Sequence, residues 1–298
     1  MNNVVCFGEI LWDVFPTHKV IGGAPLNVAL RLNTFGVHTS IISRLGTDVH
    51  GKRALDYLQQ VNLSERYVQK DTAYPTGYVS VLLDDKGSAS YEIYKPVAWD
   101  FIALDEANRI LVSETDIFIF GSLACRNEVS RQTLFKLLEQ AKFSVFDVNL
   151  RKPDYTFELL IDLMQKANVI KLNDDELQEI ASRLGVENST IKVQVETLSR
   201  QTGTQSVCVT RGSQGALLYW ENGFYENTGY QVAVKDTVGA GDSFLAALIF
   251  KLFIRKESPD TSLDFACRIG ALVASKEGAN ATVHDWEIME LTKSCKRG

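Results

Sequence analysis

The stretch KDTVGAGDSFLAAL, residues 235–248, places three small residues directly before an aspartate. Gly239, Ala240 and Gly241 leave the backbone nearly bare, and the apolar run after Asp242 is typical of a helix. The first N–H groups of a helix lack internal partners, so a phosphate can bind them closely where side chains are absent. A carboxylate beside that phosphate suits a base that takes a proton from an attacking hydroxyl. The stretch indicates phosphoryl transfer, although a glycine-rich turn with an aspartate near a helix start explains it equally well in isolation.

A second glycine-rich stretch, GTDVHGKR at 46–53, nearly matches the phosphate-binding pattern G-x-x-x-x-G-K-[ST]. Arg53 stands at the Ser/Thr position and cannot hold Mg²⁺, and Asp48 places an acid inside the would-be phosphate cradle. These two residues argue against a nucleotide loop. We therefore expect a turn and a helix start here.

Two motifs in the second half of the chain have both a structural and a functional interpretation. In KLNDDELQEI, Asn173 and Glu176 match a capping box at a helix start, or a polar pair that orders water around Mg²⁺ and nucleotide phosphates. In VTRGSQGALLY, Thr210 with Gly212 and Gly215 forms a turn, or a backbone that lies along a nucleotide. Each motif taken alone favours the structural interpretation.

Polar residues also gather where predicted strands end, which is where parallel α/β sheets bind ligands. A carboxylate can accept from two neighbouring hydroxyls, and an amide can donate and accept, so these residues could bind a polyol. Ordinary loop polarity is the alternative. The candidates in FGEILWDVFP, IGGAPLN and FDVNLRKP are Asp13, Gly22, Gly23, Asn27, Asp147, Asn149 and Arg151.

Composition narrows the class of protein. The 298 residues are 45% hydrophobic and 23% charged, as in an ordinary globular protein, and the net charge of −6 argues against nucleic-acid or anionic-membrane partners. Five cysteines without a C-x-x-C pair indicate reduced thiols, and four histidines show no metal-ligand spacing. The first residues lack a basic signal region, and the longest apolar run, FLAALIF, is too short to span a bilayer. We therefore expect a cytoplasmic protein.

Near-continuous apolar strands alternate with helical patterns along most of the chain, which predicts a parallel sheet covered by helices on both faces. Strands are expected at 4–10, 39–46, 116–122, 144–149, 168–173, 206–210 and 230–236, and a late hairpin at 215–228. Helices are expected at 22–36, 51–60, 127–141, 154–167, 173–184, 239–253 and 263–276. Residues 76–94 alternate like a hairpin around Asp-Lys-Gly-Ser and are expected in a separate small sheet.

Together and in this order, the motifs resemble the ribokinase-like (PfkB-type) carbohydrate kinase family over essentially the whole chain. GGAPLNVALRLNTFGVHTSIISRLGTDVHGK is similar to the N-terminal signature of that family, and DTVGAGDSFLAAL is similar to its C-terminal signature. Asn173-x-x-Glu176 and Thr210-x-Gly212-x-x-Gly215 lie between the two signatures. The resemblance therefore favours the functional interpretation of both middle motifs.

The resemblance implies one three-layer α/β/α domain over 1–298, with a mostly parallel central sheet and a small β-sheet lid formed by roughly 10–20 and 74–96. It implies ATP and Mg²⁺ as cofactors and a sugar as the small-molecule substrate. Asp242 would be the catalytic base, and Gly239, Ala240 and Gly241 would supply the anion hole. Sugar hydroxyls would bind Asp13, Gly22, Gly23 and Asn27, with Arg151 near them. Mg²⁺ and the phosphates would lie by Asn173 and Glu176. The nucleotide would contact residues 210–215.

Family relatives also bind a monovalent cation beside the anion hole, and some pair through the lid. A potassium ion would be held mostly by backbone carbonyls, at positions matching Asp236, Val238, Val273, Lys276, Gly278 and Thr282. A homodimer formed through the lid is left open by the same resemblance.

Among subfamilies, GEILWDVFP and DVNLR are most similar to bacterial fructokinases. The segment YKPVAWD departs from the pattern of many relatives, with Lys95 and Trp99 near the sugar. A 2-keto-3-deoxygluconate kinase, another sugar kinase or a nucleoside kinase therefore remains an alternative. A catalytically silent sugar sensor of the same fold is another, but such a protein is expected to have lost the base or a glycine, and Gly239, Gly241 and Asp242 are all present.

Overall fold

A large central sheet organises the molecule. The computed structural model describes residues 3–15, 17–83 and 89–295, and their larger sheet has nine strands. The strands run parallel except at one edge, where β12 is antiparallel to both of its neighbours, β11 and β13. In spatial order the strands are β13 (Gly223–Asn227), β12 (Ala216–Trp220), β11 (Ser206–Thr210), β10 (Val169–Asn173), β9 (Ser144–Asp147), β8 (Ile117–Gly121), β1 (Asn3–Phe7), β4 (His38–Gly46) and β5 (Val68–Asp71).

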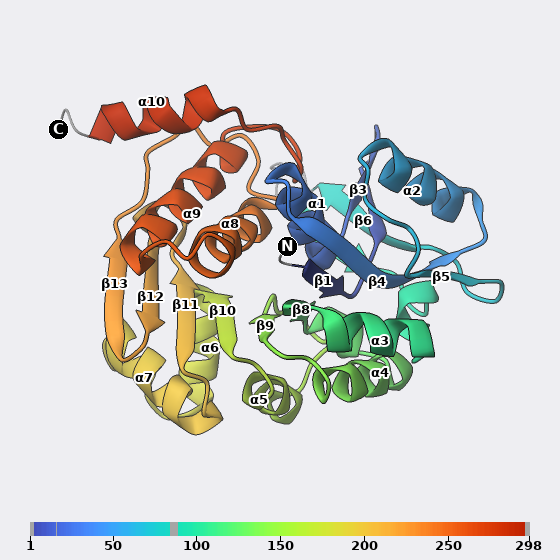
Figure 1. Ribbon diagram of the computed structural model, residues 1–298, viewed down its shortest axis with the longest axis horizontal. Coiled ribbons are helices and arrows are strands. Elements are labelled where there is room, and N and C mark those ends of the chain that lie inside the picture. Colours follow the sequence, from blue (N-terminus) through green and yellow to red (C-terminus); the bar gives the residue numbers. More distant parts are fainter. Residues whose placement is uncertain (1–2, 16, 84–88, 296–298) are drawn as a thin grey trace.

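Helices cover both faces of this sheet, as Figure 1 shows. One face carries α1 (Ala24–Thr34), α2 (Val49–Gln60), α8 (Ala240–Leu248), α9 (Pro259–Ala274) and α10 (Asp285–Cys295). The other carries α3 (Glu106–Glu114), α4 (Glu128–Leu138), α5 (Phe157–Gln165), α6 (Asp174–Arg183) and α7 (Ile191–Thr202). Each face buries its own apolar cluster, because strands such as IFIFG of β8 are buried on both sides. The predicted three-layer α/β/α architecture is confirmed.

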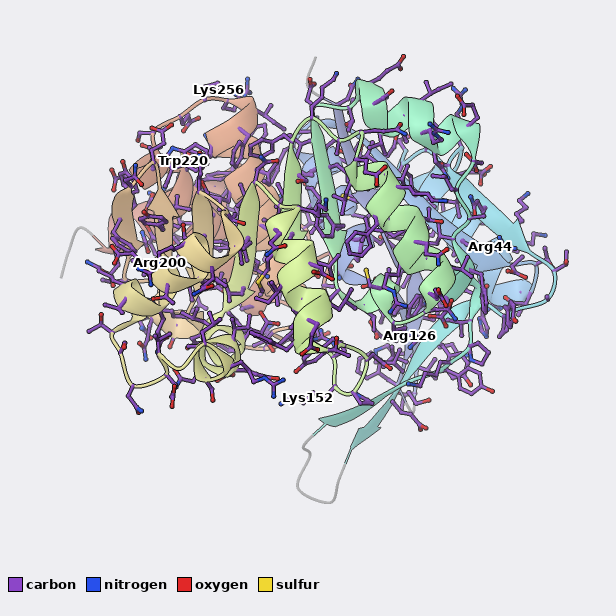
Figure 2. The ribbon with its side chains drawn as sticks, turned by 90° about the horizontal axis from the view of Figure 1, so that it is seen from below. Arg44, Arg126, Lys152, Arg200, Trp220 and Lys256 are labelled. Atoms are coloured by element: carbon purple, nitrogen blue, oxygen red, sulfur yellow. The ribbon has the colours of Figure 1, made fainter. Side chains whose placement is uncertain are left out.

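A separate four-stranded sheet lies beside the main one. Its order is β3 (Lys19–Gly22), β2 (Leu11–Val14), β6 (Gly77–Leu83) and β7 (Ala89–Ile93). The parallel pairing of β2 with β6 joins two segments that are far apart in the sequence. The hairpin of β6 and β7 projects away from the body in Figure 2. The small sheet was predicted, and its expected turn at 85–88 lies outside the described residues.

The helix after the glycine segment starts where the sequence predicts. Gly239 is the N-cap of α8 and has φ of 73°, a left-handed conformation that favours glycine. A Cβ atom there would also lie 2.5 Å from the Cα of Ala279, so two constraints require glycine. Asp242 falls in the first turn, as expected. The α-helix ends at Leu248 and continues as a π-helical segment (Ile249–Ile254), where one α-helix to 253 was expected.

One predicted strand is absent. Residues 230–236, YQVAVKD, alternate like a strand but pair with no strand in the described structure. The backbone N–H groups of Lys235 and Asp236 instead donate to the carbonyl of Ala274, at the end of α9. The prediction was wrong because a helix end, which leaves carbonyls unpaired, supplies the hydrogen-bond acceptor that a strand would otherwise provide.

Four elements were not predicted from the sequence: β5, α3, α7 and α10. The strand β5, VQKD, is short and half polar, so its pairing with β4 leaves little pattern in the sequence. The stretch at 46–53 is the predicted helix start: Asp48 caps α2 by accepting from the N–H groups of His50 and Gly51. Among the helices that the structure describes, none has the length and apolar character needed to cross a bilayer.

Candidate active site

Asp242 lies at the centre of the site, in the first turn of α8 and packed against α1. Its Oδ2 accepts a 2.8 Å hydrogen bond from the amide nitrogen of Asn27. The amide oxygen of Asn27 in turn accepts a 3.0 Å hydrogen bond from the amide nitrogen of Asn280. This second bond keeps the amide nitrogen of Asn27 directed at the carboxylate of Asp242. Burial and the charge of Asp147 raise the pKa of Asp242 to about 6, with Lys171 and Asn27 lowering it in part. A carboxylate with a pKa just below neutrality is suited to accept a proton from a hydroxyl.

Two more carboxyl groups lie on the side of the site nearest the small sheet. Burial raises the pKa of Asp13, on β2, to about 6 and that of Glu9 to about 7. The positive charge of Arg151 lowers the pKa of both, and of Asp242, so one exposed guanidinium acts on three carboxyl groups. Gly22 of β3 pairs with Leu11 of β2, and a Cβ atom on Gly22 would come within 2.6 Å of Asp13 Oδ2.

A lysine that the sequence analysis missed completes the cluster. Lys171 is 6% exposed, and its Nζ lies 2.9 Å from Oδ1 of Asp147. Burial alone would lower the pKa of Lys171, but the carboxylates of Asp147, Glu176 and Asp242 outweigh burial and raise it above its usual range. A charged residue inside the apolar strand VIKLN was the available signal, because lysine is almost never fully buried unless it is paired.

A cavity of about 320 Å³ opens beside the N-terminus of α8. It brings the two glycine motifs together, because its lining includes Thr210, Gly212 and Gly215 as well as Ala240 and Gly241. The wall opposite is mostly apolar, with Phe244, Ala271 and Ala274 among its residues. A cavity with apolar walls and bare backbone at one end can hold a flat ring and present its phosphates to the helix N-terminus.

Asn173 and Glu176 form the capping box of α6. The Asn173 side chain accepts from the N–H of Glu176, and Glu176 Oε2 accepts from the N–H of Asn173, both at 2.8 Å. Glu176 Oε1 accepts from the N–H of Leu150. The carboxylate also lies close enough to Lys171 to raise its pKa, so the cap borders the charged cluster.

The carboxylates around Lys171 fit a magnesium ion that binds with a nucleotide. Oδ2 of Asp147 is buried and receives no hydrogen bond from the described residues, and Glu176 keeps a second lone pair on each oxygen. No group of three or more His, Cys, Asp or Glu side chains within the described residues could hold a metal alone. Mg²⁺ typically takes one or two carboxylates plus phosphates and water, so this donor set suits it.

Comparisons with known proteins identify the family of the chain. The sequence profile of the pfkB family of carbohydrate kinases matches residues 1–286. The chain belongs to the pfkB family. The sequence-based assignment to that family is therefore confirmed.

Individual pfkB relatives match over nearly their full length. An uncharacterized sugar kinase of Pyrococcus horikoshii is 32% identical over 291 residues, which cover 94% of this chain and 89% of the relative. The fructokinase of Vibrio alginolyticus is 28% identical over 299 residues, covering 94% and 95%. The crystal structure of the ATP-bound fructokinase of Xylella fastidiosa superimposes with a TM-score of 0.87, covers 99% of both chains at 22% identity, and shows the shared fold.

The cation-site positions predicted for a pfkB kinase lie on two neighbouring loops and, for Val273, in the last turn of α9. Asp236 joins them, because its two carboxylate oxygens accept from the N–H groups of Val238 and Gly278, each at 3.0 Å. The ammonium of Lys276 donates to the carbonyl of Thr282 and lies 2.6 Å from Glu287. The carbonyl of Val273 accepts the N–H of Lys276. The loops adjoin Gly239 through its contact with Ala279, and the potassium site stays a prediction.

The segment that departs from many pfkB sequences is held by protein contacts. Trp99 is fully buried, with the guanidinium of Arg126 stacked 3.9 Å from its ring centre. Arg126, labelled in Figure 2 near the base of the β6–β7 hairpin, also binds both oxygens of Asp100. The ammonium of Lys95 lies 2.6 Å from Asp154. Trp99 is therefore part of the core, and the charge of Lys95 is already paired.

Proposed function

We propose that this pfkB kinase is a fructokinase, which transfers the γ-phosphoryl group of ATP to a primary hydroxyl of D-fructose. The observation that carries the proposal is the position of Asp242. Its carboxylate lies in the first turn of α8, directly after Ala240 and Gly241 of the cavity lining, and it accepts a hydrogen bond from the polar group of Asn27. A base in that position can reach a sugar hydroxyl on one side while phosphate binds on the other.

The chemistry follows from these groups. Asp242 accepts the proton of the attacking hydroxyl, and the oxygen attacks the γ-phosphorus in line with the leaving ADP. Backbone N–H groups of Gly239 and Gly241 stabilise the charge on the transferred group, because the first turn of a helix leaves such donors without helical partners, whereas the N–H of Ala240 donates to the carbonyl of Thr237 at 3.2 Å. Mg²⁺, held near Asp147 and Glu176, would neutralise phosphate charge when bound. Asn27 holds the carboxylate of Asp242 in one orientation through its 2.8 Å hydrogen bond.

The choice of a neutral sugar rests on the charges near Asp13. Asp13 and Asn27 can bind hydroxyls, whereas a keto-acid sugar needs a cation for its carboxylate. Lys95 lies 2.6 Å from Asp154, and the three carboxyl groups near Arg151 outnumber its single positive charge, so they would oppose the binding of a further anion. The relative from Vibrio alginolyticus, which is named a fructokinase, supports the same choice. The small sheet that carries Asp13 would act as a lid that excludes water.

The test is a coupled assay of ATP consumption with fructose, 2-keto-3-deoxygluconate, ribose and adenosine under one condition. We expect the highest kcat/KM for fructose, because a site built to bind a hydroxyl rejects analogues lacking it by up to about 10⁴–10⁵. A tenfold or greater preference for another compound would overturn the fructose assignment but not the kinase assignment. No turnover with any sugar would contradict both.

A further inference from the structure

Lys171 is a buried cation whose neighbours are the groups of the proposed reaction. It lies on β10, directly opposite Asp147 of β9 in the parallel register. Its Nζ is 3.2 Å from the point that a Cβ atom on Gly241 would occupy. Gly241 also lines the nucleotide cavity. The ammonium therefore borders the space where a phosphate would contact the first turn of α8.

The ammonium has unused donors on this border. A lysine ammonium carries three hydrogens, and within the described residues Lys171 makes one hydrogen bond, to Oδ1 of Asp147. Two hydrogens are therefore available to a ligand. Because Lys171 is 6% exposed, the protein holds these donors in place without much solvent around them, so a bond to a phosphate oxygen would be strong.

The negative charge around Lys171 also favours a cation at this position. Asp147, Glu176 and Asp242 all act on Lys171 electrostatically, so three carboxyl groups surround one ammonium. A triphosphate would add several negative charges to this acidic cluster. The protein therefore needs fixed positive charge beside the transferred group, in addition to the charge that a metal ion supplies.

We propose that Lys171 is a catalytic residue whose ammonium donates hydrogen bonds to the γ-phosphoryl group of ATP, while Asp147 holds the ammonium in position. The proposal rests on the proposed function. During transfer, the bond between the sugar oxygen and the γ-phosphorus forms and the bond from that phosphorus to the bridging oxygen breaks. The electron pair of the broken bond leaves with ADP, and the hydroxyl proton goes to Asp242. Lys171 keeps its protons and stabilises the non-bridging oxygens.

The first test compares nucleotide binding in the absence of sugar. Lys171→Met alone would leave Asp147 buried without its partner, so the main variant is K171M/D147N, which removes both charges. Because Asp147 is also one of the carboxylates placed near Mg²⁺, the reference is Asp147→Asn alone. Calorimetry with Mg-ATP and Mg-ADP should show the ATP affinity of K171M/D147N lowered by about tenfold or more relative to that reference, since a hydrogen bond to a charged group is lost. ADP affinity should stay within about threefold of that of Asp147→Asn, because ADP lacks the γ-phosphoryl group.

The control is Lys136→Met, at an exposed position on α4, which should change neither affinity. Unchanged ATP affinity in K171M/D147N would overturn the proposal. An equal loss of ATP and ADP affinity would also overturn it, because it would show that the pair only maintains the fold. Binding decides this question even if the wild-type protein phosphorylates no sugar, in which case the proposed function alone fails.

The second test is kinetic. The kcat of K171M/D147N with the best sugar should fall by about 10²–10³-fold relative to Asp147→Asn, the usual effect of losing one donor to transition-state charge. Lys171→Arg keeps the charge and should recover part of the loss. In Lys171→Met the acid limb of the pH–rate profile should move to higher pH, because Lys171 lowers the pKa of Asp242. A wild-type kcat in the double variant would refute the catalytic role.

Discussion

The nucleotide side and the sugar side of the site are built differently. On the nucleotide side, the cavity, the first turn of α8 and the Lys171–Asp147 pair all belong to the main sheet and the helices packed on it. On the sugar side, Asp13 comes from the separate four-stranded sheet, while Asn27 comes from α1 of the main body. The phosphate chemistry is therefore preorganised, whereas the sugar contacts depend on how two sheets meet.

The largest effect is expected at the residue that both sides share. Asp242→Asn removes the proton acceptor but keeps the shape of the side chain, so the fold and ATP affinity should stay. The kcat should fall by roughly 10²–10⁴-fold, the usual contribution of a positioned general base. Steady-state kinetics measures this, with Glu139→Asn on the exposed surface as control. Turnover within a few-fold of wild type would exclude Asp242 as the base.

A change on the sugar side alone should separate the two halves. Asp13→Ala removes a carboxylate that can accept from two hydroxyls, so kcat/KM for fructose should fall by roughly 10²–10³-fold. ATP affinity should stay near that of wild type, because the main body binds the nucleotide. Asp162→Ala, at an exposed position on α5, is the control. Equal losses for fructose and ATP would show that Asp13 supports the whole site.

The reciprocal change is Gly241→Val, on the nucleotide side. A β-branched side chain there would stand in the cavity and within about 3.2 Å of the Lys171 ammonium, blocking phosphate from the helix N-terminus. ATP affinity should fall by about tenfold or more, and fructose affinity should not change. Calorimetry with each ligand measures both. Retained ATP affinity and kcat would argue against an anion hole at α8.

The smallest effect concerns the stability of the ligand-free protein. The pKa values of Glu9, Asp13 and Asp242 are raised to about 7, 6 and 6 by burial, whereas the unfolded chain has ordinary values near 4. The folded state therefore binds protons that the unfolded state does not as pH falls from 8 to 5, and stability should rise over this range.

The variant Glu9→Gln tests the contribution of Glu9 to this pH dependence of stability. Glu9 is 3% exposed and its Oε2 receives no hydrogen bond from the described residues, so a neutral amide should be tolerated. The Tm at pH 8 should rise by about 2–4 °C, and the gain should fall to less than half of that near pH 5.5, because it disappears only below the unfolded pKa near 4.5. Thermal unfolding at both pH values measures it, with exposed Glu139→Gln as control. A gain independent of pH would contradict the raised pKa.

The sequence predicts the local structure at the starts of α6 and α8 well, because backbone requirements restrict it. Only glycine satisfies both the left-handed φ and the close packing at Gly239, and a capping box needs Asn173 and Glu176 three residues apart. Such local constraints are visible in one sequence. The expected layers follow in the same way, because a fully buried strand such as β8 requires a continuous apolar run.

The sequence predicts less where distant segments decide the outcome. Lys171 has no motif of its own, and its role depends on Asp147 from the neighbouring strand. Residues 230–236 alternate like a strand in sequence, but the backbone N–H groups of Lys235 and Asp236 donate to the carbonyl of Ala274 at the end of α9. Trp99 stands where a sugar contact was considered, but the stacking of Arg126 keeps it in the core. Sugar identity rests on such long-range packing, and so it stays a proposal.

The central claim is that the sugar side is completed by movement of the small sheet, whereas the nucleotide side is already formed. Hydrogen exchange followed by mass spectrometry, with and without saturating fructose, measures this directly. We predict that fructose increases protection in 11–22 and 77–83, while 206–215 changes little until Mg-ADP is added. Equal protection of the small sheet with and without fructose would contradict the claim.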